Sequence, residues 1–161
     1  MNLGDLPLVL VIDDDPDQLD LARVAAHRAG GIRSMGAESG AEAMILLDAR
    51  RAMRLPAPDL VLTDLKMPEM SGLELIEALR KRPEMKDVPV FFLTSTAYDP
   101  DREHAHVAGA AGFFQKPIHF SGLVALMQAL ASKHSPRVET SSEEENNEAV
   151  ASKPTPHDFL G

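Results

Sequence analysis

The sequence of 161 residues contains no cysteine, no tryptophan and a single tyrosine. Zero cysteine is consistent with a reducing compartment, although it is compatible with any other. No apolar run is long enough to span a bilayer, and no basic region precedes an apolar core at the N-terminus. We therefore expect a cytoplasmic chain with no signal peptide and no membrane partner.

Basic residues are also scarce, with 16 Lys and Arg against 25 Asp and Glu and a net charge of -9. Binding of duplex phosphates needs clustered Lys and Arg, so we expect no direct contact with nucleic acid. The sequence lacks the H-E-x-x-H motif, the Walker loop and the dinucleotide glycine fingerprint. What it does have is 44% apolar residues, which predicts a globular chain with one core.

Five short apolar runs alternate with segments of helical periodicity. This alternation predicts a parallel sheet with right-handed crossovers and helices on both faces. We expect strands near residues 8–12, 32–35, 59–64, 88–93 and 112–115. We expect helices near residues 16–29, 40–51, 71–82, 101–108 and 120–130. Asp15 ahead of Pro16 is the predicted N-cap of the first helix.

Four of the predicted strands end in residues that carry chemistry: Asp13 with Asp14, then Asp64, Thr94 and Lys116. Open α/β sheets bind ligands at the carboxyl ends of their strands. If the strand order is 2-1-3-4-5, the first and third strands are neighbours and their three carboxylates converge on one cleft. These carboxylates repel one another, so a proton or a cation must neutralise them. Oxygen ligands suit Mg²⁺, and with one lysine and one hydroxyl they can hold a phosphoryl group.

The strand ends lie within four longer motifs, which are 11–15 (VIDDD), 62–72 (LTDLKMPEMSG), 92–95 (FLTS) and 112–117 (GFFQKP). In this order and spacing they resemble the signature segments of the response-regulator receiver domain of two-component signalling. The resemblance covers residues 7–133. It implies a flavodoxin-like α/β fold, a doubly wound five-stranded parallel sheet of order 2-1-3-4-5 flanked by five helices.

The resemblance implies roles for the residues around the acidic cluster. Asp64 would accept a phosphoryl group from a phosphohistidine on a sensor histidine kinase or phosphotransfer protein. Asp14, Asp64 and the backbone carbonyl of Lys66 would ligate Mg²⁺ directly, and Asp13 would act through a metal-bound water. The domain would be no enzyme beyond self-catalysed phosphoryl acceptance and autodephosphorylation. We also predict that Lys66 and Thr96 influence the lifetime of the acyl phosphate.

The other matches concern the phosphate and the switch. Lys116 would pair with a phosphoryl oxygen, Thr94 would turn its hydroxyl to another, and Ser95 would be small enough for phosphate to approach. Pro117 would follow a cis peptide bond, which is costly except before proline. Phe113 stands where many members of the family carry a switch tyrosine, and it offers no hydroxyl. An alternative interpretation makes Phe113 an ordinary core residue.

Two other functions stay open at this point. The first is a receiver that no longer cycles and serves as a constitutive binding or dimerisation surface. The second is a phosphatase resembling the haloacid-dehalogenase superfamily, which also has an early aspartate pair, then Thr or Ser, then Lys. That superfamily needs a late acidic pair, yet the next acidic residue after Lys116 is Glu139, and Asp64 would have no role.

The composition changes near residue 135. Residues 135–161 hold six acidic residues and two basic ones, a local charge of -4, with few apolar residues. We expect residues 134–161 to form an acidic, disordered tail, in which Glu143, Glu144 and Glu145 are a solvated charge run. No effector sequence follows the last predicted helix, so we expect a stand-alone regulator. Its expected face for a target protein or a homodimer comprises the fourth helix, the fifth strand and the fifth helix.

Overall fold

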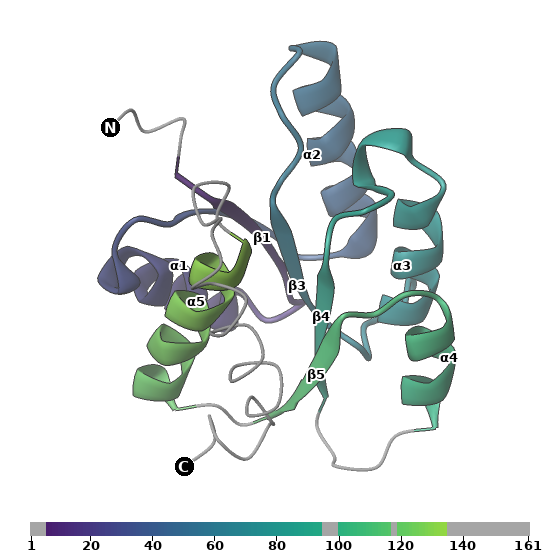
Figure 1. Cartoon of the computed structure of the whole chain (residues 1–161). Coiled ribbons are helices and arrows are strands. Elements are labelled where there is room, and N and C mark those ends of the chain that lie inside the picture. Colours follow the sequence, from purple (N-terminus) through teal and green to yellow (C-terminus); the bar gives the residue numbers. More distant parts are fainter. Residues whose placement is uncertain (1–5, 95–99, 117–118, 135–161) are drawn as a thin grey trace, which may run out of the picture.

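The computed structural model describes residues 6–94, 100–116 and 119–134, in which five parallel strands lie between two layers of helices (Figure 1). The strands are β1 (Leu8–Ile12), β2 (Arg33–Ala37), β3 (Leu60–Asp64), β4 (Val90–Thr94) and β5 (Gly112–Gln115). Hydrogen bonds order them β2-β1-β3-β4-β5, and every neighbouring pair is parallel. The predicted flavodoxin-like α/β fold is therefore confirmed.

The helices follow the strands in the predicted alternation. They are α1 (Pro16–Ala29), α2 (Gly40–Ala52), α3 (Gly72–Arg80), the 3-10 helix η2 (Pro83–Met85), α4 (Asp101–Val107) and α5 (Phe120–His134). The predicted cap of α1 is present, since the Asp15 side chain accepts a hydrogen bond from the backbone N of Asp17. Ser71 and Glu74 form a capping box at the start of α3.

Every helix in the described part of the chain is too short or too polar to pass through a lipid bilayer.

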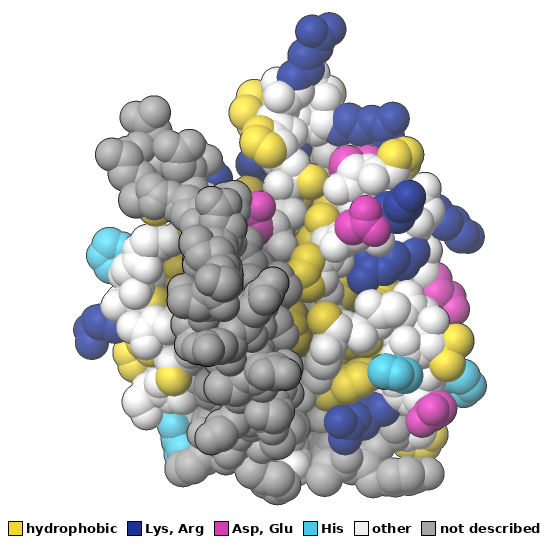
Figure 2. Space-filling model, in the orientation of Figure 1, with side chains coloured by type: hydrophobic (Ala, Val, Ile, Leu, Met, Phe, Trp, Pro, Cys, Tyr) yellow, Lys and Arg dark blue, Asp and Glu magenta, His cyan; other side chains and the backbone are white. Residues whose placement is uncertain are grey.

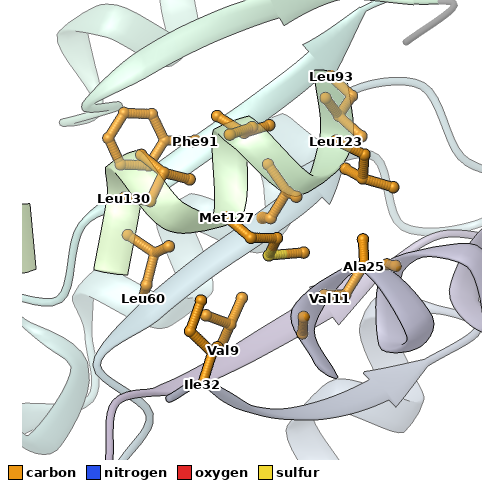
Figure 3. Close-up of a cluster of buried hydrophobic side chains, with 14 of the residues drawn as sticks. Val9, Val11, Ala25, Ile32, Leu60, Phe91, Leu93, Leu123, Met127 and Leu130 are labelled. Atoms are coloured by element: carbon orange, nitrogen blue, oxygen red, sulfur yellow. The ribbon is translucent and has the colours of Figure 1, made fainter. Parts of the chain in front are cut away.

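Strand β1 shows why the apolar runs are continuous. Alternate side chains of a strand point to opposite faces of the sheet. Val9 and Val11 pack into the apolar cluster beneath α1 and α5, whereas Leu10 and Ile12 pack into the cluster beneath α2, α3 and α4. Both faces of the strand are buried, so every position is apolar. Figure 3 shows the first cluster, with Met127 of α5 among the side chains over the sheet.

Several boundaries differ from the sequence prediction. Strand β2 extends to Ala37, because Gly36 and Ala37 continue the pairing with β1. Strand β4 begins at Val90 rather than residue 88, because the backbone N of Val88 still bonds to the carbonyl of Met85 in the η2 turn. The helix η2 and the last turn of α5 were not predicted. Residues 135–161 lie outside the described residues, so the expected disorder of the tail stays a prediction.

Candidate functional site

Three carboxylates meet where β1 and β3 end side by side (Figure 1). Asp13 and Asp14 follow β1 directly, and Asp64 is the last residue of β3. One carboxylate oxygen from each of the three lies within 4.8 Å of the other two. Asp13 is buried, Asp64 is partly buried and Asp14 is exposed, so the cluster opens to solvent on one side. The convergence expected from the strand order is confirmed.

Lys116 follows β5 and reaches into this cluster. Its Nζ donates hydrogen bonds to Asp13 Oδ2 at 3.0 Å and to Asp64 Oδ2 at 3.2 Å. The backbone N of Lys116 donates to the carbonyl of Thr94 at 2.6 Å, which ties the lysine to the end of β4. Asp13 also accepts a hydrogen bond from the backbone N of Asp15 at 3.0 Å. One ammonium group therefore contacts two of the three clustered carboxylates.

The charge balance of this cluster shifts two pKa values upward. Burial raises the pKa of the Asp64 carboxyl; Lys116 opposes this rise, and the charges of Asp13 and Asp14 add to it. Burial by itself would lower the pKa of the Lys116 ammonium, but its hydrogen bonds and charge contacts with Asp13 and Asp64 outweigh burial and raise it. The lysine keeps its proton while the aspartate ionises less readily, as expected of a site that is short of positive charge.

Of the other predicted site residues, the structure describes Thr94 and Lys66, whereas three more lie outside the described residues. Thr94 is buried at the end of β4. The side chain of Lys66 lies in the loop after β3 and pairs with Asp101, at the start of α4, with 3.2 Å between Nζ and Oδ2. Ser95, Thr96 and Pro117 lie outside the described residues, so their roles stay predictions, as does the cis peptide bond. The metal-ligand role of the Lys66 backbone carbonyl is likewise a prediction.

Gly72, the first residue of α3, lets this helix approach the end of β3 closely. A Cβ at this position would lie 2.7 Å from the backbone O of Asp64, 2.7 Å from a ring carbon of Phe92 and 2.9 Å from Leu65 Cα. The backbone N of Gly72 donates to the carbonyl of Leu65 at 2.8 Å. The end of β3 is thus held against α3 by contacts with the backbone and with the Phe92 ring, which leave no room for a side chain at residue 72.

Phe113 of β5 sits between two other side chains. Its ring stacks on Phe92 with 5.7 Å between centroids, and the guanidinium carbon of Arg102 lies 4.7 Å from its centroid. Sequence reasoning did not single out Arg102 or Asp101, which are the second and first residues of α4. The available signal was positional, because α4 starts at the same edge of the sheet as the carboxylate cluster.

A hollow of about 210 Å³ opens beside the cluster, between α1 and α5. Asp13 and Lys116 form its floor next to the carboxylates, and Asp15, Gln18 and Leu21 line its α1 side. Leu21 is 42% exposed. Two residues of the site, Asp13 and Lys116, are therefore open to this hollow.

The donor set was tested for its fit to a metal. Three carboxylates offer hard oxygen ligands, and none of the three clustered residues contributes nitrogen or sulfur. Mg²⁺ prefers this chemistry and binds through one or two carboxylates together with waters and phosphate oxygens. The exposed side of the cluster, at Asp14, leaves space for such further ligands. The residues present therefore fit a divalent cation.

The family model described as the response regulator receiver domain matches residues 9–128. The chain belongs to the response regulator receiver family. The receiver is a signalling module of two-component systems and typically is not an enzyme. This assignment decides against the haloacid-dehalogenase-like alternative.

This chain matches most of the length of one curated relative but only a quarter of the length of another. The chain is 33% identical over 110 residues to the polar-differentiation response regulator DivK of Brucella anthropi, covering 68% of this chain and 84% of that protein. It is 34% identical over 120 residues to a probable cyclic di-GMP phosphodiesterase of Vibrio cholerae, covering 73% of this chain but 25% of that protein. The receiver therefore occurs both in short relatives and as a part of much longer ones.

A solved structure, the chemotaxis protein CheY4 of Vibrio cholerae, superimposes with a TM-score of 0.65 at 26% identity. The match covers 76% of this chain and 97% of that one. The backbone likeness agrees with the strand order and supports the receiver fold.

Proposed function

We propose that Asp64 accepts a phosphoryl group from a phosphohistidine of a sensor histidine kinase or phosphotransfer protein, in the cytoplasm and with Mg²⁺. The observation that carries the proposal is the double contact of Lys116 Nζ with Asp13 and Asp64 beside a third carboxylate, Asp14. A receiver fold with this charge pattern at the carboxyl edge of its sheet is suited to hold a dianionic group.

The transfer forms a bond between Asp64 Oδ and phosphorus and breaks the bond between phosphorus and the donor imidazole nitrogen, which leaves with its electron pair. Asp64, partly buried at the tip of β3, is the nucleophile. Asp14, Asp64 and the Lys66 carbonyl would hold Mg²⁺, with Asp13 acting through a bound water, and the ion would supply positive charge for the phosphoryl oxygens. Lys116 exchanges its contact with Asp64 for one with a phosphoryl oxygen, so its charge stays neutralised.

The donor would approach through the hollow between α1 and α5. This opening leads to Asp13 and Lys116, and exposed Leu21 at its rim offers apolar contact area to a docking helix. Phosphoryl transfer needs positioning more than covalent assistance, so an open, preformed entrance is sufficient. The incoming group would leave the sheet and its helices in place.

The readout would be a population shift on the surface formed by α4, β5 and α5. The hydroxyl of Thr94 turns to the phosphoryl group, and the ring of Phe113 moves into the space that Thr94 vacates, which alters the contact with Arg102. Such a shift requires a target protein, or a second copy of this chain, that binds the two states with different affinity. We assign residues 7–133 to this receiver and residues 134–161 to its tail.

The test is labelling by acetyl phosphate with Mg²⁺, followed by intact-mass measurement. The wild-type chain should gain one phosphoryl group, and Asp64→Asn should gain none. Asp15→Asn is the matched control, because asparagine retains the N-cap and Asp15 lies outside the carboxylate cluster. Equal labelling of Asp64→Asn would refute the proposal, and no labelling of the wild type would favour the non-cycling receiver.

A further inference from the structure

The C-terminal end of α2 carries a concentration of positive charge on an otherwise acidic chain. A hollow of about 390 Å³ there is lined by Leu47, Arg50, Arg51, Arg54, Leu55, Pro56, Ala57 and Glu84. Figure 2 shows Lys and Arg side chains gathered over this end of the molecule, where α2 and α3 end. We call the three arginines 50, 51 and 54 the α2 arginine patch. It lies at the sheet edge opposite to the carboxylate cluster.

The patch is not neutralised by its own lining. The one carboxylate of the lining, Glu84, already accepts a hydrogen bond from Arg82 Nε at 3.0 Å. Arg82 also donates to Asp48 at 2.8 Å, and the charge of Glu84 interacts with Arg51 as well. Arg82 and the three patch arginines thus face two carboxylates, which leaves positive charge in excess. Arg50 Nε donates to the carbonyl of Pro56 at 2.9 Å, which fixes one guanidinium at the rim.

Helix geometry accounts for part of this charge. Arg50 and Arg51 lie in the last turn of α2, where cations favour the negative end of the helix dipole. Arg54 lies beyond the helix with a φ of 60°, a left-handed conformation that suits glycine. An arginine in this conformation costs conformational free energy. The helix dipole also stabilises it less than it stabilises a cation in the last turn of α2. The helix dipole therefore accounts for Arg50 and Arg51 better than for Arg54.

The tail of this chain has the complementary charge and a favourable starting point. Residues 135–161 hold six acidic residues and two basic ones, with three consecutive glutamates at 143–145. Leu130 of α5 and Leu60 of β3 belong to one core cluster (Figure 3), and Pro56 of the hollow precedes Leu60 by four residues. The end of α5 and the hollow therefore flank the same end of β3. The nine residues from 134 to 143 can span up to about 30 Å, so the glutamates at 143–145 can reach well beyond the end of α5.

We infer that the acidic segment 139–148 of the tail binds the α2 arginine patch of the same chain. The arginines of α1, Arg23 and Arg28, form a weaker alternative because they are two rather than three, and the guanidinium of Arg28 already lies over the Phe120 ring, with 5.8 Å between Cζ and the centroid. Docking at the patch places the negative tail at the edge opposite to Asp64, where it neither blocks the hollow beside Lys116 nor repels an incoming phosphodonor. The inference does not depend on phosphoryl transfer at Asp64.

The experiment is a distance measurement between two nitroxide labels in the full-length chain. The native sequence has no cysteine, so Ile45→Cys on α2, where the side chain is 66% exposed, and Ser142→Cys in the tail give two unique labelling sites. We expect a population of short distances at low ionic strength. Its loss is expected in Arg51→Glu with Arg54→Glu, and at about 1 M salt, where the Debye length is about 3 Å.

Two controls make the outcome decisive. Reversing Glu143, Glu144 and Glu145 to Arg in the Arg51→Glu, Arg54→Glu background should restore the short distances, which a nonspecific loss of structure would not allow. Arg23→Glu with Arg28→Glu should leave them unchanged. The inference is overturned if the patch reversal leaves the distances unchanged or if the α1 reversal alone abolishes them. It is also overturned if excess unlabelled chain removes the short distances, because the tail would then bind a second copy.

Discussion

The guanidinium of Arg102 on α4 covers the ring of Phe113 on β5, with 4.7 Å between Cζ and the ring centroid. The same ring also stacks on Phe92 of β4. The aromatic side chain at the expected switch position is thus held between its neighbouring strand and the first turn of α4. The preceding residue, Asp101, pairs with Lys66 in the loop after β3, so α4 contacts both this loop and Phe113.

Removing the cation above this ring should loosen Phe113. We expect Arg102→Gln to lower the free energy of unfolding by about 0.5–1 kcal/mol, the usual strength of an exposed cation–π contact. Arg102→Lys keeps a positive charge and should lose less. Urea denaturation measures the stability, and aromatic NMR should show faster exchange of the Phe113 ring in Arg102→Gln. Identical ring signals in all three proteins would contradict a holding role for Arg102.

Lys116 and a divalent cation compete to neutralise the same carboxylates. We expect Lys116→Gln to lower the stability of the metal-free chain by about 1–3 kcal/mol, because Asp13 and Asp64 lose their positively charged donor and glutamine offers only a neutral amide. The same change should tighten Mg²⁺ binding about tenfold, or about 1.4 kcal/mol, since one positive charge leaves the site. Calorimetric titration measures the affinity, and Lys81→Gln is the control. Weaker Mg²⁺ binding in Lys116→Gln would show that the lysine orients the carboxylates rather than competing with the cation.

Because the pKa of Asp64 is raised, we expect its ionisation to lower the free energy of unfolding of the metal-free chain in a pH-dependent way. Asp64 holds its proton more tightly in the folded chain than in the unfolded chain, where its pKa has the ordinary value of 3.8. The stability that the protonated Asp64 carboxyl contributes is therefore fully present below pH 3.8, and it is lost as the pH rises through the pKa of the folded state. We expect Asp64→Asn to be more stable than the wild type at pH 7 with chelator, and this advantage to shrink as the pH falls towards 3.8.

Magnesium should make the wild type more stable than Asp64→Asn, which reverses the order expected without metal. At about 100 times its Kd, Mg²⁺ adds about 2.7 kcal/mol to a chain that binds it only when folded. The wild type should gain this stability, and Asp64→Asn should gain less because one proposed ligand is missing. Thermal denaturation at several pH values, with and without Mg²⁺, checks both statements. An unchanged difference between the two proteins from pH 4 to 8 would remove the electrostatic explanation.

The sequence predicted best what depends on local pattern and strand order. The apolar run 8–12 and the position of Asp64 at the end of β3 follow from patterns read along the chain. The meeting of Asp13, Asp14 and Asp64 followed once the strands were ordered. The contact of Arg102 with Phe113 could not be predicted in this way, because helical periodicity does not reveal which side chain of α4 faces β5. The helix η2 was also missed, since Pro83 was interpreted only as the end of α3.

Gly72 supplies a test of how closely α3 must approach β3. Gly72→Ala places a Cβ 2.7 Å from the backbone O of Asp64, and backbone cannot yield as a flexible side chain does. We expect a loss of about 1–3 kcal/mol in stability and slower phosphorylation, because the loop bearing the acceptor must shift. Gly36→Ala is the matched control, with its Cβ at an ordinary 3.5 Å from the Leu19 side chain. Equal stabilities of the two variants would show that the loop adapts freely.

Variants of the ion pair between Lys66 and Asp101 can distinguish an effect on the lifetime of the acyl phosphate from an effect on the stability of the fold. Both side chains are well exposed, at 57% and 36%, so breaking the pair should change stability by less than about 1 kcal/mol. The pair holds the lysine stem beside the expected path of an attacking water. Asp101→Asn should therefore shorten the acyl-phosphate lifetime about threefold, or roughly 0.6 kcal/mol. Lys66→Ala should do the same, and the double variant should go no further than either single one.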